Sequence, residues 1–124
     1  MSSVYKKNIE LSLAFTIMWK NEISTDVYLS KDRKHVHIEK YTVVPGRQPF
    51  MGGKIDTPRI YEFLKSRCYE DGYVGLSEIL RAANLTYNDP WKWCEYSNGV
   101  TWDDYLWIKY PKNKNLRWED VRCR

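Results

Sequence analysis

Residues 9–19 read Ile-Glu-Leu-Ser-Leu-Ala-Phe-Thr-Ile-Met-Trp, and this segment carries the strongest structural signal in the sequence. Apolar side chains occupy every odd position, and most of the even positions carry polar or smaller side chains. Because side chains alternate between the two faces of a β-strand, a period of two predicts a strand with one buried face. We expect a single inward row made of Ile9, Leu11, Leu13, Phe15, Ile17 and Trp19.

Two further strands are predicted after this one. Residues 25–29 place Val27 and Leu29 at inward positions, and residues 36–44 place Val36 and Ile38 there. The connections between these strands are short and polar, which favours an antiparallel meander. The sequence therefore predicts an N-terminal antiparallel sheet of about three strands in a β-rich half, residues 1–45.

The second half, residues 57–124, follows a connecting segment that is rich in proline and glycine, residues 45–56. Thr57 before Pro58 predicts a helix start, because the hydroxyl can cap the first turn and proline suits the first helical position. A buried helical stripe follows, and Gly72 is the predicted stop. The stripe consists of Ile60, Phe63, Leu64 and Cys68.

Two shorter helices and a late strand complete the pattern. Helices are predicted over residues 76–83, with Asn84 as the C-terminal cap, and over 90–97, between Asp89-Pro90 and Asn98-Gly99. Residues 105–110 alternate and predict a returning strand. We expect one α+β domain over residues 1–124, with central short helices and a late C-terminal strand.

The composition is that of a folded, soluble chain. Of the 124 residues, 43% are hydrophobic and 15% are aromatic, which is too many for a disordered chain. No apolar run approaches the roughly 20 residues of a membrane-spanning helix, and no continuous apolar segment resembles a secretory signal. Three widely spaced cysteines without a C-x-x-C pair predict free thiols and a cytoplasmic location. They are Cys68, Cys94 and Cys123.

The formal net charge of +4 arises entirely in the last sixteen residues. Residues 1–108 contain fourteen basic and fourteen acidic side chains, whereas the tail has six basic residues against Glu119 and Asp120. Cations next to aromatic rings suit a phosphate backbone and its bases, although the tail can equally be a solvated terminus. The candidate nucleic-acid-binding residues are Lys109, Lys112, Lys114, Arg117, Arg122 and Arg124.

Eight Trp and Tyr residues lie within residues 91–118, and one small core cannot bury all of them with every polar atom bonded. Exposed Trp and Tyr next to Arg are typical of protein interfaces. The candidate partner-binding residues are Trp93, Tyr96, Tyr110, Arg117 and Trp118. Alternatively, the cluster seals the strands against the helices, and Trp102 and Trp107 are then the best core candidates.

Catalytic and metal-binding patterns are weak. His35 and His37 share one strand face, as paired metal ligands do, but a third ligand is missing and an exposed polar face explains them equally. The pairs Asp103-Asp104 and Glu119-Asp120 would diverge on a helix and suit its first turn. We therefore expect neither a metal, nor a cofactor, nor enzymatic activity, with a small hydrolase or nuclease as the remaining alternative.

Two segments carry a resemblance to a known family: residues 99–109, GVTWDDYLWIK, and residues 116–121, LRWEDV. They resemble an accessory segment that precedes the kinase-like domain in HipA-like proteins of Gram-positive bacteria and also occurs alone in small proteins. The resemblance covers about residues 57–124. It implies a prokaryotic protein, from a phage or another mobile element, near toxin–antitoxin or defence systems. The chain lacks the phosphate loop and catalytic motifs of a kinase, so no activity carries over.

Taken together, these features predict a non-enzymatic protein–protein interaction module with a regulatory or inhibitory role. Its expected partner is a larger protein, such as a HipA-like kinase or a host-defence nuclease, the second in the manner of an anti-CRISPR inhibitor. The alternative is a nucleic-acid-binding protein that uses the basic, aromatic tail. No membrane partner is expected.

Overall fold

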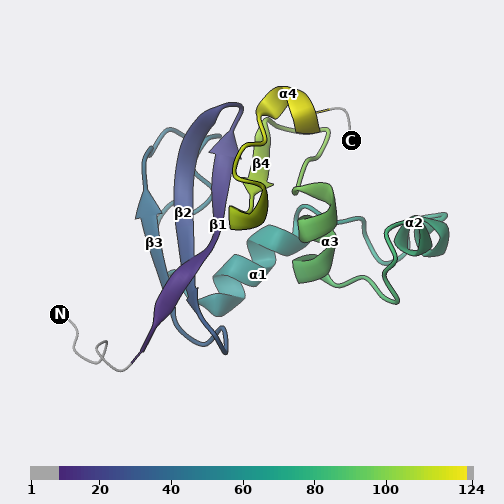
Figure 1. Cartoon of the computed structure of the whole chain (residues 1–124), viewed down its shortest axis with the longest axis horizontal. Coiled ribbons are helices and arrows are strands. Elements are labelled where there is room, and N and C mark those ends of the chain that lie inside the picture. Colours follow the sequence, from purple (N-terminus) through teal and green to yellow (C-terminus); the bar gives the residue numbers. More distant parts are fainter. Residues whose placement is uncertain (1–8, 123–124) are drawn as a thin grey trace.

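The computed structural model describes residues 9–122, and they form a four-stranded antiparallel sheet with several short helices. The sheet consists of β1 (Leu11–Trp19), β2 (Glu22–Ser30), β3 (Val36–Lys40) and β4 (Leu106–Lys109). Its strand order is β3-β2-β1-β4, so the late strand joins the sheet beside β1 (Figure 1). The predicted α+β class, the N-terminal sheet and the late strand are confirmed.

Within residues 9–122, five short helical segments accompany the sheet. They are α1 (Thr57–Lys65), α2 (Leu76–Ala82), α3 (Pro90–Ser97), the 3-10 turn η2 (Pro111–Asn113) and α4 (Trp118–Val121). Figure 1 shows α1 and α3 next to the sheet, while α2 stands apart from it. Within the described residues, no helix combines the length and the hydropathy that a bilayer crossing needs.

Local signals explain the helix boundaries. Asp89 caps α3 by accepting a hydrogen bond from Trp91 N, and Asn98 ends it in the left-handed conformation with φ 59°, as predicted. The cap of α1 is Asp56, not Thr57, because the Asp56 carboxylate accepts from Arg59 N. The predicted stop at Gly72 is also wrong, since α1 ends at Lys65.

The main core lies between α1 and one face of the sheet. Its fully buried members include Ile17, Val27, Ile60 and Leu64. Phe50 joins them from the connecting segment, where Gln48 Nε2 donates to Thr25 Oγ1 and to Thr42 O. Residues 45–56 are therefore part of the packed structure. A second cluster, Met18, Trp107 and Val121, lies on the other face of the sheet.

The predicted inward row of β1 is wrong before Phe15, because the strand has a β-bulge at Ala14. Leu13 lies opposite Tyr28 whereas Phe15 lies opposite Val27, so Ala14 is an extra residue in the ladder. Leu11 and Leu13 therefore lie on the opposite face of the sheet from Phe15, and Leu13 is 37% exposed while Phe15 is 2% exposed. The third strand is also shorter than predicted, because β3 ends at Lys40 rather than at residue 44.

The outer edge of β4 is closed by hydrogen bonds from other parts of the chain. Ile108 N donates to Asn98 O at 2.7 Å, and Ile108 O accepts from the Asn98 side-chain amide at 3.0 Å. Leu106 N donates to Asp104 Oδ1, and Leu106 O accepts from the Arg67 guanidinium. These are the main-chain groups that an additional strand would otherwise bond.

Candidate functional site

Three aromatic rings meet at the end of the sheet where β1 turns into β2. Trp19 ends β1, Tyr105 precedes β4, and Trp118 begins α4. The ring centroids of Trp19 and Tyr105 are 5.8 Å apart, and those of Tyr105 and Trp118 are 5.9 Å apart, both in edge-to-face geometry. Tyr105 is 50% exposed, whereas Trp19 is half-buried against the main core and Trp118 is half-buried against the cluster of Met18, Trp107 and Val121.

Two cations stack on the same rings. The Lys20 ammonium lies 4.5 Å from the centroid of Tyr105 and 5.0 Å from that of Trp19. The Arg47 guanidinium lies 3.8 Å from the Trp19 ring, which is close cation–π contact. We call these residues together the hairpin-end surface: Trp19, Lys20, Arg47, Tyr105 and Trp118.

Hydrogen bonds hold the elements of the hairpin-end surface together. Lys20 N donates to Tyr105 O at 3.0 Å, and Trp107 Nε1 donates to Lys20 O at 2.7 Å. Asn21 links the β1–β2 turn to α4, because Trp118 N donates to its side-chain oxygen at 2.8 Å. Its amide nitrogen donates to Glu119, and this hydrogen bond holds the pKa of that carboxyl below its usual value. The rings are thus fixed before any partner binds.

Trp102 corrects a prediction. It is completely exposed, whereas the interpretation of the cluster as core made it a buried residue beside Trp107. Trp107 is fully buried, as expected. The difference arises because the alternation of a strand begins only at β4, and Trp102 lies in the bend before it. In that bend, the side chain directed inward is Asp104, which binds Arg67.

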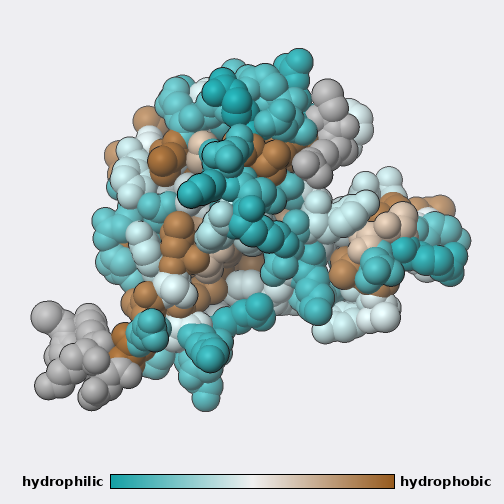
Figure 2. Space-filling view, in the orientation of Figure 1, coloured by the Kyte–Doolittle hydropathy of each residue, from teal (hydrophilic) through white to brown (hydrophobic). Residues whose placement is uncertain are grey.

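A second row of aromatic rings lies on the helical half. Tyr73, Tyr69, Trp93 and Tyr96 follow one another with centroid separations of 4.5, 5.7 and 5.4 Å. Trp93 is only 9% exposed and packs with Leu80, whereas Tyr96 is 51% exposed. Figure 2 shows hydrophobic side chains gathering at α2 nearby.

The structure does not bring the five candidate partner-binding residues into one cluster. Trp93 and Tyr96 contact each other on α3, and Arg117 and Trp118 are neighbours at the start of α4. Tyr110 belongs to the main core, where it packs against Phe15, and only 9% of it is exposed. Sequence reasoning missed Trp19, Lys20, Arg47, Tyr105 and Trp102.

The candidate basic residues are partly engaged within the chain. The Lys109 ammonium lies 5.5 Å from the ring of Trp107. Lys112 pairs with Glu95 at 4.0 Å, and Arg117 pairs with Glu119 at 3.3 Å. Lys114 and Arg122 are exposed, and Arg124 lies outside the described residues.

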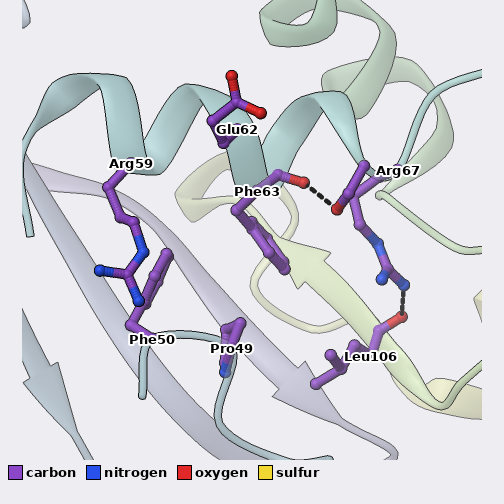
Figure 3. Close-up of a pocket in the computed structure, with 8 residues that line it drawn as sticks. Pro49, Phe50, Arg59, Glu62, Phe63, Arg67 and Leu106 are labelled. Atoms are coloured by element: carbon purple, nitrogen blue, oxygen red, sulfur yellow. Dashed lines mark hydrogen bonds between the residues drawn. The ribbon is translucent and has the colours of Figure 1, made fainter. Parts of the chain in front are cut away.

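A cleft of about 310 Å³ lies between α1 and the segment that contains Phe50 (Figure 3). The rings of Phe50 and Phe63 form its apolar wall, with Arg59 and Arg67 at its two ends. Arg59 donates to Gly52 O and to Lys54 O, so its guanidinium already holds the connecting segment. The cleft could accommodate a small apolar group, but both of its cations are committed to structure.

Arg67 is the most deeply buried charge of this region, with 5% of its side chain exposed. It donates two hydrogen bonds to the Asp104 carboxylate, at 2.7 and 2.9 Å, and one to Gly99 O at 2.7 Å. Burial alone would raise the pKa of Asp104, but the hydrogen bonds and the charge of Arg67 outweigh it and lower that pKa. The pair fastens the segment before β4 onto the end of α1.

The remaining candidates for chemistry have structural or exposed settings. His37 Nε2 lies 2.5 Å from Glu39 on the exposed face of β3. Glu119 bonds Asn21, and Asp120 accepts from Arg117 N, which caps α4. Between residues 9 and 122, no group of three His, Cys, Asp or Glu side chains is placed to hold a metal ion.

Comparisons with known proteins add no relative. No family model, no curated protein and no solved structure matches this chain. Its function must therefore be argued from its own residues.

Proposed function

We propose that the protein is a non-enzymatic protein–protein interaction module, regulatory or inhibitory, that binds a larger protein through the hairpin-end surface and Trp102. The observation that supports this most strongly is the edge-to-face cluster of Trp19, Tyr105 and Trp118, in which Tyr105 is half exposed and two cations lie over the rings. Trp, Tyr and Arg dominate the binding energy of protein interfaces. Rings that are fixed in advance also lose little conformational entropy on binding.

The charge of the hairpin-end surface indicates the chemistry of the partner. Lys20 and Arg47 lie over its rings, and Arg117 lies beside Trp118. Glu22 and Glu119 offset only part of this positive charge. A partner surface that combines apolar groups with Asp or Glu fits best. From the sequence resemblance, we propose a HipA-like kinase or a host-defence nuclease as the type of partner.

The test is affinity capture from a bacterial lysate with three forms of the protein: wild type, Trp102→Ala and Tyr87→Ala. Tyr87 is the matched control, since it is 63% exposed and lies outside the hairpin-end surface. Trp102 is fully exposed, so its removal leaves the fold intact. We expect a stoichiometric protein partner whose dissociation constant rises at least tenfold in Trp102→Ala and stays unchanged in Tyr87→Ala.

Nuclease treatment and high salt distinguish protein binding from the alternative function, nucleic-acid binding by the basic tail. A protein partner that is retained equally by both variants would contradict the assignment of Trp102 to the interface. Recovery of nucleic acid alone, lost after nuclease treatment or in high salt, would instead favour the basic tail. Lys114 and Arg122 would then be the first residues to replace, because both are exposed.

A further inference from the structure

Two cysteine side chains far apart in the sequence meet at one main-chain oxygen. The Cys68 thiol donates to Leu64 O at 3.4 Å, and the Cys94 thiol donates to the same oxygen at 3.5 Å. Both cysteines are free thiols in the structure. Cys68 follows α1 and Cys94 lies on α3, so the packing of these two helices brings the sulfurs together.

The surroundings of the two thiols differ. Cys68 is partly exposed and lines a groove of about 360 Å³, together with Lys65, Tyr69 and Asn88. Cys94 is completely buried in the main core and does not line that groove. A reagent dissolved in water therefore reaches Cys68 before Cys94.

The pKa values of the two thiols also differ, and the lower one belongs to the accessible cysteine. The neighbouring Cys94 side chain lowers the pKa of Cys68, although burial and the carboxylates of Asp89 and Asp71 act in the opposite direction. The neighbouring Cys68 side chain, together with burial, raises the pKa of Cys94. The thiolate, which is the reactive form of cysteine, is thus favoured at the accessible position.

We propose that Cys68 and Cys94 form an oxidation site at which a hydroperoxide reacts with Cys68 and the two sulfurs end as a disulfide. In the first step, the Cys68 thiolate attacks the outer peroxide oxygen and the O–O bond breaks. The alkoxide takes up a proton and leaves as the alcohol, or as water when the oxidant is hydrogen peroxide. Cys68 is left as a sulfenic acid.

In the second step, the Cys94 sulfur attacks the Cys68 sulfur and the S–O bond breaks. The hydroxide leaves as water with the proton of Cys94. The two-electron oxidation of the thiol pair is balanced by the reduction of one peroxide. Because both thiols already lie at the Leu64 main-chain oxygen, this step competes effectively with further oxidation of Cys68 to the sulfinic acid.

The disulfide would close the base of the segment that carries α2. Residues 69–93 lie between the two cysteines, and α2 stands away from the sheet in Figure 1. Its attachment includes the small cluster of Leu80, Ala83 and Trp93. A covalent link at the base of a chain segment reduces the number of open conformations that the segment can reach. Oxidation should therefore slow amide hydrogen exchange within residues 69–93.

The experiment is disulfide mapping of the full chain, as wild type and as Cys123→Ser, after exposure to hydrogen peroxide and alkylation of the remaining thiols. Cleavage after Lys and Arg gives peptides 68–81 and 93–109, each with one cysteine. We expect a cross-linked pair of these peptides as the main product, and dithiothreitol should separate them. Cys68 as sulfinic acid with an unmodified Cys94 would overturn the proposal, and so would two unreacted thiols.

Two variants test the order of the steps, with circular dichroism as the check of folding. In Cys94→Ser, the sulfenic acid at Cys68 should persist long enough to be trapped by dimedone. In Cys68→Ser, Cys94 should remain reduced, and its oxidation at the wild-type rate would overturn the assigned order. The mapping uses both native cysteines, so it decides the proposal even where a variant fails to fold.

Discussion

Asp104→Ala should destabilise the protein by about 2–3 kcal/mol. The substitution removes both hydrogen bonds from Arg67 to the carboxylate and also the acceptor of Leu106 N. Removing one partner of a fully buried ion pair costs about 3–5 kcal/mol, because the other charge stays buried and unpaired. Arg67 fits that case with 5% exposure, but 32% of the Asp104 side chain is exposed. Water therefore replaces part of the lost interaction, which lowers the expected cost.

Urea unfolding followed by tryptophan fluorescence measures this loss. The midpoint should fall by about 1–2 M urea while the slope of the transition stays unchanged. Asp103→Ala is the matched control, because it removes a neighbouring carboxylate that is exposed and makes no ion pair with Arg67. If the two variants lose the same stability, the reasoning about the buried pair is wrong.

Acidification supplies an independent check of the same pair. The pKa of Asp104 is lower in the folded protein than its ordinary value of 3.8. The stabilisation by the carboxylate is therefore complete above about pH 4 and is lost as the pH falls through the lower, folded-state pKa. The stability difference between wild type and Asp104→Ala should shrink in that acidic range. A difference that is constant down to pH values below that pKa would contradict the assignment.

Two other substitutions give further predictions. Gly99→Ala should lose about 2–3 kcal/mol, since Gly99 has φ +65° and an added Cβ would lie 2.8 Å from Ile108 Cδ1. Gly46→Ala is the control, because Gly46 has φ +87° with open space around it, and it should lose only about 1 kcal/mol. Thermal melting measures both variants, and equal losses would contradict the role of the contact with Ile108. Trp107→Phe should lose about 2–3 kcal/mol, because the ring is fully buried and Nε1 donates a hydrogen bond to a main-chain oxygen. An unchanged melting temperature would show that neither the volume nor the hydrogen bond matters.

Local signals in the sequence were sufficient for the elements that depend on near neighbours. The start of α3 at Pro90 and its end before Asn98 follow from a capping carboxylate, a proline and a left-handed cap that are all close in the sequence. The inward positions of Val27 and Leu29 follow from simple alternation. Such features need no knowledge of the tertiary structure.

Features that depend on distant residues were missed. The bulge at Ala14 is visible only against the partner strand, because alternation continues unbroken in the sequence. The burial of Phe50 depends on Gln48, whose side chain bonds Thr25, a strand residue more than twenty positions away. The contact between Arg47 and Trp19 was missed for the same reason, since these residues meet only through folding. The full exposure of Trp102 was missed because the nearby Asp104 is held inward by Arg67, which is distant in the sequence.

The closed edge of β4 limits how copies of this protein could associate through their sheets. Asn98, Asp104 and Arg67 occupy the main-chain groups at which a strand would join beside β4. Of the two outermost strands, only β3 therefore offers free main-chain groups along its outer edge to a further strand. Two copies that paired through β3 would each use that edge, and the result would be a closed pair with a two-fold axis. With the outer edge of β4 occupied, a continuous fibre cannot form by alternate pairing of β3 and β4.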